Sequence, residues 1–253
     1  MDLTLLKIGT GNAKLDGIAN FELPAGHSCP FADTCLSKAN KETGKITDGK
    51  NIEFRCFAAS SENRFPAVRA LRWHNFDLLK KAKTVEAMKQ LIFNSIISNK
   101  KADKIQKVRI HSSGDFYNQS YFDAWLEVAK MFPNKLFYAY TKALKFWVAR
   151  LGEIPNNVVL TASFGGRNDE LIEQHNLRYV KVLMSPLEAE KLGLELDHDD
   201  SHAFTNDNKS FALLVHGTQP AGSEASKAKQ LLRKQGIKGY SKNNKKEKLK
   251  IAA

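Results

Sequence analysis

The side chains best suited to chemistry in this sequence are its three cysteines, Cys29, Cys35 and Cys56. They fall within 28 residues, and the 197 residues that follow contain no other cysteine. An odd number of cysteines in so long a chain argues against a disulfide framework. Cysteines that only fill a core would be spread along the chain. Because thiolates are preferred ligands of soft metals, the clustering predicts that the three share one metal centre.

The spacing Cys-x5-Cys-x20-Cys leaves three alternatives open. Structural zinc normally takes four protein ligands, often from closely spaced cysteine pairs, so zinc would need His27, His74 or Asp33 as a fourth ligand. An iron–sulfur cluster can be held by three thiolates, which leaves one iron open to a substrate or cofactor. Three free or partly buried thiols are the third alternative. The spacing favours a [4Fe-4S]-type cluster, and Arg55 is then a candidate donor to cluster sulfur.

A second group of polar residues and glycines stands where predicted strands end. These ends are His111–Asp115, Tyr140–Lys142, Ser163–Arg167, Ser185 and His216–Gln219. Each one alone fits an ordinary turn from strand to helix, but five together predict a pocket for a small-molecule ligand. Asp115 and Lys142 are candidates to bind an amine or carboxylate of that ligand, or to pair with each other.

The elements that must position these residues alternate between strand and helix from about residue 70 to residue 236. Strands are expected within 107–116, 135–142, 157–166, 178–185 and 210–223, and helices within 66–82, 84–101, 120–132, 144–154, 168–176, 186–193 and 224–236. This order predicts an α/β fold with a mostly parallel sheet, either open or closed into a partial (β/α)6-like barrel. In both cases ligands sit at the carboxyl ends of the strands.

Domain organisation and charge separate the chain into a body and a tail. We expect a single α/β domain over residues 1–226, in which residues 1 to about 66 form a loop-rich segment carrying the cysteines. Residues 227–253 are expected to form a basic helix and tail. Residues 226–253 contain ten Lys or Arg and one Glu, which is +9 of the net charge of +12. Such a tail can bind nucleic acid through its phosphates, or it is simply a solvated terminus.

Two further segments carry chemistry-bearing side chains. The stretch Leu196–His202 gathers three Asp and two His, which suits metal binding or acid–base work, although such loops are more often only solvated. Arg69, Arg72, Trp73 and His74 lie close together on a predicted helix and would suit a nucleotide. The simpler interpretation is an amphipathic helix that buries Trp73 and exposes its charges.

The composition also bears on compartment. No run of about 18 apolar residues is present, so no membrane span or membrane partner is expected. The N-terminal sequence lacks the basic and apolar regions of a signal peptide. We therefore expect the chain to remain in the cytoplasm, where thiols stay reduced.

Several long motifs together resemble those of a known family. They are LPAGHSCPFADTC, EFRCFAAS, RIHSSGDFYNQSYFDAWLEVA, FYAYTK, LTASFGG, DHDDSHAF and LLVHGTQPAGS. In this order they resemble the bacteriophage proteins called gene-product-88-like, over residues 3 to about 226. The resemblance implies a phage protein that acts in the cytoplasm of the host cell.

That family is in turn distantly similar to radical-SAM barrels, in which a cysteine loop precedes the main run of strands and a strand end binds the amine of S-adenosylmethionine. The resemblance implies a radical-SAM-like enzyme that binds this cofactor. The residues it implicates, together with Lys142, are Ser113, Gly114, Asp115, Ser163, Gly165 and Gly166. The spacing departs from the Cys-x3-Cys-x2-Cys of most radical-SAM enzymes. The alternative is a non-catalytic iron–sulfur or zinc-stabilised protein that binds nucleic acid or a phage or host protein.

Overall fold

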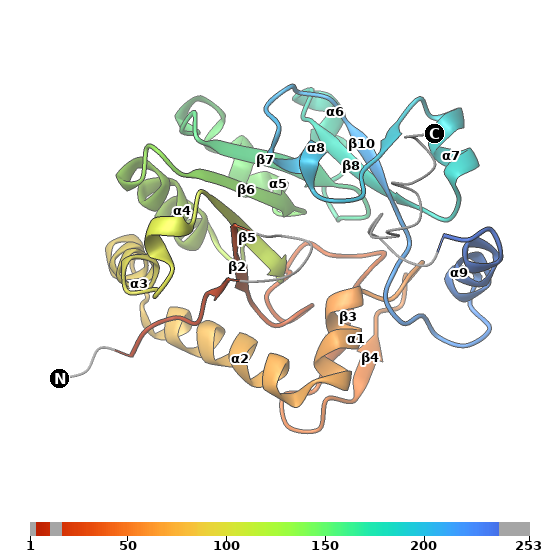
Figure 1. The fold of residues 1–253 in the computed structure, drawn as a ribbon, viewed down its shortest axis with the longest axis horizontal. Helices are drawn as coiled ribbons and strands as arrows, with labels where there is room; N and C mark the ends of the chain where they lie inside the picture. The colour runs from red at the N-terminus through yellow and green to blue at the C-terminus, as the bar shows by residue number, and fades with distance from the viewer. Residues whose placement is uncertain (1–3, 11–16, 238–253) are drawn as a thin grey trace, which may run out of the picture.

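The computed structural model describes residues 4–10 and 17–237 of the chain (Figure 1). Its main sheet has the strand order β1-β2-β5-β6-β7-β8-β10-β9. The strands are β1 (Gly9–Thr10), β2 (Ile18–Glu22), β5 (Lys107–Ser113), β6 (Leu136–Thr141), β7 (Val158–Ser163), β8 (Tyr179–Leu183), β9 (Glu195–Leu196) and β10 (Phe211–Leu214). All neighbouring pairs are parallel except β1 with β2. The predicted α/β class with a mostly parallel sheet is confirmed.

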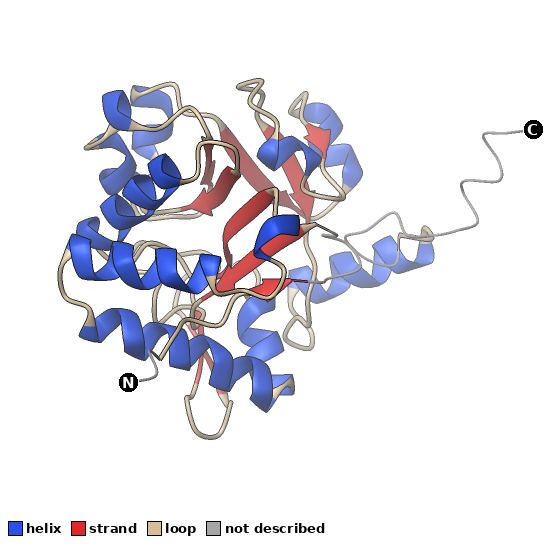
Figure 2. Cartoon of the chain, turned by 60° about the vertical axis from the view of Figure 1, so that its left-hand side comes forward, coloured by secondary structure: helices blue, strands red, loops and turns tan. Residues whose placement is uncertain are grey.

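Nine α-helices lie between or beside these strands in the described residues. They are α1 (Phe57–Arg64), α2 (Pro66–Lys81), α3 (Val85–Ile97), α4 (Gln119–Met131), α5 (Leu144–Val148), α6 (Glu170–Gln174), α7 (Pro186–Lys191), α8 (Ser201–Phe204) and α9 (Glu224–Lys234). Because crossovers between parallel strands are right-handed, winding in one direction places α3 to α6 on one face, whereas α8 packs against Tyr138 on the other face. Figure 2 shows the larger helices outside the sheet, and α3 to α6 share one apolar core with it.

The two faces of the sheet differ in chemistry because side chains alternate along each strand. Val108, Phe137 and Leu160 point toward the helices and are buried in the main core. Their neighbours Arg109 and Tyr138 belong to the opposite face, which we call the inner face. Strands β2, β5, β6 and β7 bring to it several polar side chains, whereas β8 and β10 bring apolar ones. This face therefore has a polar half and an apolar half.

Local signals in the sequence correctly predicted several element boundaries. Pro66 occupies the first turn of α2, and the Thr84 side chain accepts a hydrogen bond from the Ala87 amide at the start of α3. The segment up to residue 66 was predicted to be loop-rich, and it contains several short elements, of which the longest are β2 and α1. Each is short, and β2 buries residues on both faces, so neither produces a clear periodicity.

The segment between β2 and α1 carries Cys29 and Cys35 and crosses the carboxyl ends of the strands. It includes a small hairpin, β3 (Ser37–Ala39) with β4 (Ile46–Asp48). Backbone hydrogen bonds fix the segment to the sheet: the Leu23 amide donates to the Ser113 carbonyl at 2.8 Å, and the amides of Asp33 and Thr34 donate to the Gly165 carbonyl at 3.1 Å. We call residues 23–56 the cysteine segment.

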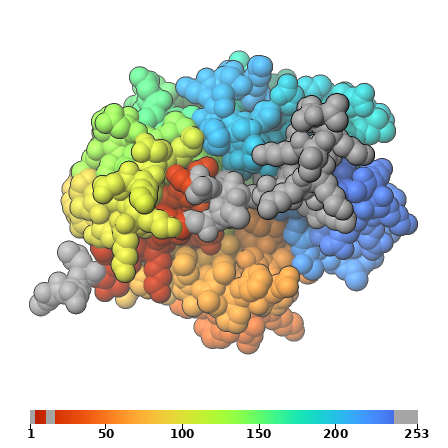
Figure 3. All heavy atoms as spheres, viewed as in Figure 1, coloured from red at the N-terminus to blue at the C-terminus, as the bar shows by residue number. Residues whose placement is uncertain are grey.

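The space-filling view shows the same arrangement as two halves. The N-terminal segments and α2 (red to orange) form the lower part of this face, and the later strands with their helices (green to cyan) form the upper part (Figure 3). The strand pairing itself describes a sheet with two edges, β1 and β9. The strand pairing does not determine whether the sheet curves into the predicted partial barrel, which stays a prediction.

The predicted domain boundary near residue 226 falls inside α9. Ala225 and Leu232 of this helix are buried against the end of β10, so α9 packs on the α/β body. The greater part of the predicted basic tail, residues 238–253, lies outside the described residues. No helix in the described ranges is both long and apolar enough to cross a membrane.

Gly114 provides a test of how closely the cysteine segment approaches the sheet. Its φ is +88°, and an added Cβ would lie 2.5 Å from the Ser28 Oγ and 2.6 Å from the Leu23 Cβ. We expect Gly114→Ala to lower the free energy of unfolding by about 2–4 kcal/mol, from backbone strain and overpacking. Urea unfolding measures this change. The matched control is Gly152→Ala, whose Cβ meets nothing within 4 Å; equal effects of the two substitutions would contradict the close approach.

Candidate metal centre and cavity

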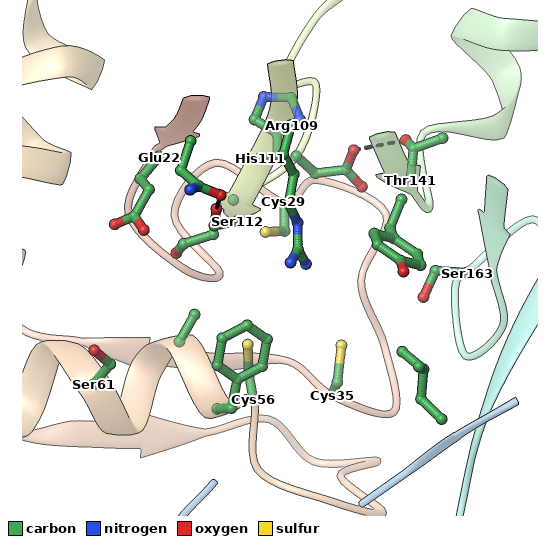
Figure 4. A pocket seen from close by; sticks show the side chains of 18 of the residues that line it. Glu22, Cys29, Cys35, Cys56, Ser61, Arg109, His111, Ser112, Thr141 and Ser163 are labelled. Atoms are coloured by element: carbon green, nitrogen blue, oxygen red, sulfur yellow. Dashed lines mark hydrogen bonds between the residues drawn. The ribbon is translucent and has the colours of Figure 1, made fainter. Parts of the chain in front are cut away.

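The three cysteines line one cavity of about 720 Å³ at the carboxyl ends of the strands. Cys29 and Cys35 come from the cysteine segment, and Cys56 immediately precedes α1. Figure 4 shows the three sulfur atoms directed toward the same space. All three residues are half-buried free cysteines. The structure therefore brings together thiols that the sequence places up to 27 positions apart.

The surroundings of Cys29 and Cys56 raise the pKa values of their thiols. Burial raises the pKa of Cys29 well above its usual range, and the nearby Asp115, Cys56 and Cys35 add to this effect. Burial and Cys35 also raise the pKa of Cys56 to about 11, although hydrogen bonds from the Ala59 and Ala58 backbone act against the rise. Three adjacent thiolates would therefore repel one another unless a cation lay between them, which is the role of a bound metal.

The side chains proposed as a fourth zinc ligand lie elsewhere. His27 Nε2 is 3.0 Å from the Ala39 carbonyl, and His74 Nε2 is 2.9 Å from the Leu5 carbonyl. The Asp33 carboxylate accepts a hydrogen bond from Asn51 at 3.0 Å. None of the three lines the cavity. Within residues 4–10 and 17–237, no three His, Cys, Asp or Glu side chains are grouped closely enough to hold a single metal ion.

A buried ion network holds α1, and with it Cys56. Arg72 of α2 donates to Glu22 of β2 at 2.9 Å and to Glu62 of α1 at 3.0 Å, and it also donates to the Ala58 carbonyl at 2.8 Å. Arg72 is 3% exposed and Glu62 is fully buried. Because Arg72, Glu22 and Glu62 belong to three different elements, their network fixes the start of α1 relative to the sheet.

The other arginine of that helix is held by backbone carbonyls. Arg69 is buried and donates to the backbone carbonyls of Lys41, Glu42 and Glu62. The simpler interpretation, a helix that exposes its charges, is wrong for both Arg69 and Arg72. The sequence could not reveal this because the partners are backbone carbonyls and carboxylates from distant elements.

Asp115 is fully enclosed beneath the cavity wall. Its carboxylate accepts hydrogen bonds from the Thr141 hydroxyl at 2.6 Å and from the amides of Lys142 and Phe116 at 2.8 Å. Burial raises its pKa to about 6 despite these donors. Asp115 thus links the end of β5 to the end of β6.

Lys142 lines the cavity but its amine is directed to the next strand. The Nζ donates to the Ser163 carbonyl at 2.8 Å, to the Ser163 hydroxyl at 2.9 Å and to the Phe164 carbonyl. The hydrogen bond from Lys142 to the Asp115 carboxylate comes from the Lys142 backbone amide, and not from the side-chain amine as predicted. Lys142 therefore ties the ends of β6 and β7 together.

The predicted cofactor-binding residues divide into two groups. Ser113, Gly114 and Ser163 line the cavity together with Asp115 and Lys142. Gly165 and Gly166 are not among the lining residues, and their amides instead donate to Asp169. At Gly165 φ is +91°, and an added Cβ would collide with the Thr34 hydroxyl. These two glycines hold the cysteine segment in place rather than facing the cavity.

Sequence reasoning missed a polar cluster on the inner face. Asp200, which is 1% exposed and has a φ of +65°, reaches the sheet from the acidic stretch 196–202. It accepts from Arg109 Nη1 at 2.8 Å, from the Tyr138 hydroxyl at 3.0 Å and from the Tyr140 hydroxyl at 3.2 Å. The only hint in the sequence is alternation of polar residues in β5 and β6. The stretch 196–202 thus contributes a buried anchor, and its predicted metal site is not formed by the described residues.

His111 was expected only as part of a strand end. It lies at a register shift between β2 and β5, with a φ of +72°. Its ring packs on Phe21 and Phe116, and Nε2 is 3.0 Å from the Tyr121 hydroxyl. Burial, and then Arg109, lower the pKa of His111 to about 3. The ring is therefore neutral and helps to shape the cavity wall.

Comparison with known proteins agrees with the motifs. Residues 4–234 match the family described as Gene product 88. The chain belongs to the Gene product 88 family. Over 140 residues it is 33% identical to the Gene 88 proteins of Mycobacterium phages D29 and L5, which covers 52% of this chain and 50% and 51% of those relatives. The chain spans about half the length of the curated relatives it matches. No solved structure matches it significantly.

In this Gene product 88 chain, Arg55 lines the cavity with the cysteines, and its charge is paired with the hairpin. Its guanidinium pairs with Asp48 of the hairpin, which lowers the pKa of that carboxyl through hydrogen bonding. Its backbone exchanges hydrogen bonds with the Gln219 side chain at 2.7 and 3.0 Å. The residue predicted to donate to cluster sulfur instead fixes the chain next to Cys56.

Asp115 predicts a pH dependence of stability. Because its pKa is about 6 in the folded chain and 3.8 ordinarily, the folded state binds the proton more tightly. The resulting stabilisation is full below pH ~4 and is lost as the pH rises through ~6, about 3 kcal/mol in all. The difference in unfolding free energy between wild type and Asp115→Asn should fall by about this amount over that range.

Urea unfolding at several pH values measures this difference. Asp103→Asn, a substitution at an exposed carboxylate, is the control for the change of side chain. A wild-type-minus-Asp115→Asn difference that stays constant with pH would contradict the buried, proton-binding state of Asp115.

Proposed function

We propose that Cys29, Cys35 and Cys56 bind an iron–sulfur cluster of the [4Fe-4S] type, and that its fourth iron faces a small molecule in the cavity. The observation that carries the proposal is the position of the sulfur atoms: three thiols from separate places in the chain line one cavity. Bound there, a cluster would supply one-electron chemistry, which no protein side chain of the cavity offers.

A zinc ion and a cluster place different demands on the three thiols. A zinc ion binds sulfur at about 2.3 Å, so tetrahedral ligands must lie about 4 Å apart. The described residues provide no such group of three or more ligands. In a cluster each cysteine binds a different iron, so its ligands surround a larger core. Three cysteines then leave one iron for a ligand that is not part of the protein.

The surroundings of the thiols also suit a cluster. Backbone groups of Gly26 hydrogen-bond to Cys29, and those of Ala58 and Ala59 to Cys56. Such bonds to ligand sulfur stabilise its negative charge and tune a cluster's reduction potential. The apolar side chains Val180 and Val182 line another part of the cavity and limit the access of water.

S-adenosylmethionine is the cofactor that we propose for the open iron. The support is the order of elements: β2, the cysteine segment and then β5, which ends in Ser113, Gly114 and Asp115 beside the thiols. This order is similar to that of radical-SAM barrels, and the analogy is one of arrangement only. The enzyme would act in the host cytoplasm.

Metal loading tests the cluster. We expect the chain, expressed and purified without oxygen, to contain iron and acid-labile sulfide in equal amounts and to absorb broadly in the visible range. Cys29→Ser, Cys35→Ser and Cys56→Ser should each lose most of the iron, because each removes the ligand of one iron atom. Iron, sulfide and zinc assays measure the outcome.

The controls for this experiment are His27→Gln and Asp33→Asn. Both change a side chain of the cysteine segment that the zinc alternative needs as a ligand, and the cluster proposal expects both to retain iron. Stoichiometric zinc that is lost in either variant would contradict the cluster and support the zinc-stabilised alternative.

Cofactor binding tests the enzymatic part separately. Calorimetric titration of S-adenosylmethionine into the iron-loaded chain should give saturable binding, and the same titration into Cys35→Ser should give none, because the open iron is lost. If the iron-loaded chain releases no heat of binding, a non-catalytic iron–sulfur protein becomes the better description. In that description residues 227–253 are the candidate contact for nucleic acid.

A further inference from the structure

Arg109 lies at the centre of the polar half of the inner face. It belongs to β5, and its side chain retains 15% exposure although its neighbours are closely packed. Figure 4 shows the Arg109 side chain extending into the cavity, toward the space that the cysteine sulfurs face. A cation is thus directed at the same volume as the three thiols.

The other cations that line the cavity are directed into the protein. Arg55 pairs with Asp48, and Arg72 is shared between Glu22 and Glu62. The Lys142 amine binds oxygen atoms of the β7 end. These three groups join elements of the fold; Arg109 is also paired, with Asp200, but its side chain extends into the cavity.

The partners of Arg109 fix the direction of its guanidinium. Asp200 accepts from Nη1 at 2.8 Å, and the Tyr140 ring lies 5.1 Å from Cζ. Asp200 is itself held by the hydroxyls of Tyr138 and Tyr140. Burying this charge pair has a desolvation cost that apolar side chains would avoid. A network that holds a guanidinium at a cavity is typical of anion recognition, because guanidinium geometry matches carboxylate and phosphate oxygens.

We propose that Arg109 is the anion-binding residue of the cavity, that it recognises an oxyanion, carboxylate or phosphate, of a small organic ligand, and that Asp200 and Tyr140 position it. The facing wall, which includes Val180, Val182 and Leu213, would contact the apolar part of this ligand. The inference deepens the proposed function by naming the class of ligand beside the cluster.

Titration calorimetry of the full chain with three probes tests the proposal. Benzoate and phenyl phosphate supply the two oxyanions on the same apolar ring, and benzamide is the neutral analogue. We expect at least one anion to bind about tenfold or more tightly than benzamide, as one charge-assisted contact allows. Whichever anion binds more tightly identifies the oxyanion. A wild-type chain without preference for either anion overturns the proposal.

Substitutions locate the preference. Arg109→Gln should remove it, and Asp200→Asn should reduce it while leaving benzamide binding unchanged, because the cation remains but is less firmly held. Lys130→Gln, which removes one exposed charge on α4, should retain it. An anion preference that persists in Arg109→Gln overturns the proposal.

Two additions keep the result decisive. Arg109→Gln leaves Asp200 buried without its cation, so the double variant Arg109→Gln/Asp200→Asn removes both charges, and it should fold and show no preference. Iron content is measured on each sample. An anion preference in a chain that never takes up iron rejects the cluster but retains the role of Arg109, whereas an iron-loaded chain indifferent to Arg109→Gln rejects only this inference.

Discussion

The attachment of the cysteine segment to the strand ends is the interaction on which the site depends. Cys29 and Cys35 lie in no helix or strand, so only tertiary contacts can place them. The carbonyls of Ser113 and Gly165 accept the amides of that segment, and these carbonyls would otherwise stand unsatisfied at the edge of the buried sheet. The same hydrogen bonds therefore satisfy the sheet and position the thiols, and they bring the segment so close that a Cβ at Gly114 or Gly165 would collide with it.

The third thiol is positioned by a different kind of force. Cys56 is fixed through α1, whose Glu62 is joined to Arg72 in surroundings where both are almost inaccessible to water. Buried ion pairs add little net stability, because desolvation offsets their attraction, but removing one partner is costly. The Arg72–Glu62 pair therefore favours one packing of α1 on β2 over other packings of that helix. Backbone hydrogen bonds therefore position Cys29 and Cys35, whereas a buried ion pair positions Cys56.

Features that depend on residues close together in the sequence were predicted, and hydrogen-bond partners far apart in the chain were not. Helix starts at Pro66 and Thr84 depend on neighbouring residues, and they were predicted correctly. The meeting of the strand ends and thiols in one cavity follows from the topology of parallel strands. The partners of Arg69 and the pairing of Arg109 with Asp200, 91 positions apart, depend on the folded arrangement. Gly165 and Gly166 lie at the predicted strand end but outside the cavity lining, and sequence cannot separate the two cases because close approach to a ligand and to a loop both require glycine.

Electrostatics connects the proposed cluster to the inner face. The three thiolates, even with a cluster's iron between them, and the Asp115 carboxylate would add negative charge to the cavity, which disfavours an anionic ligand unless a cation faces it. The charges of Arg55, Arg72 and Lys142 are already neutralised or held by protein oxygens. Attraction for a ligand oxyanion would come from a cation that projects into the cavity from a rigid element, and the cation's own acidic partner would weaken that attraction. Arg109 meets both conditions, because it projects into the cavity and belongs to β5. Its ion pair with Asp200 fixes the side of the cavity on which such a ligand would bind.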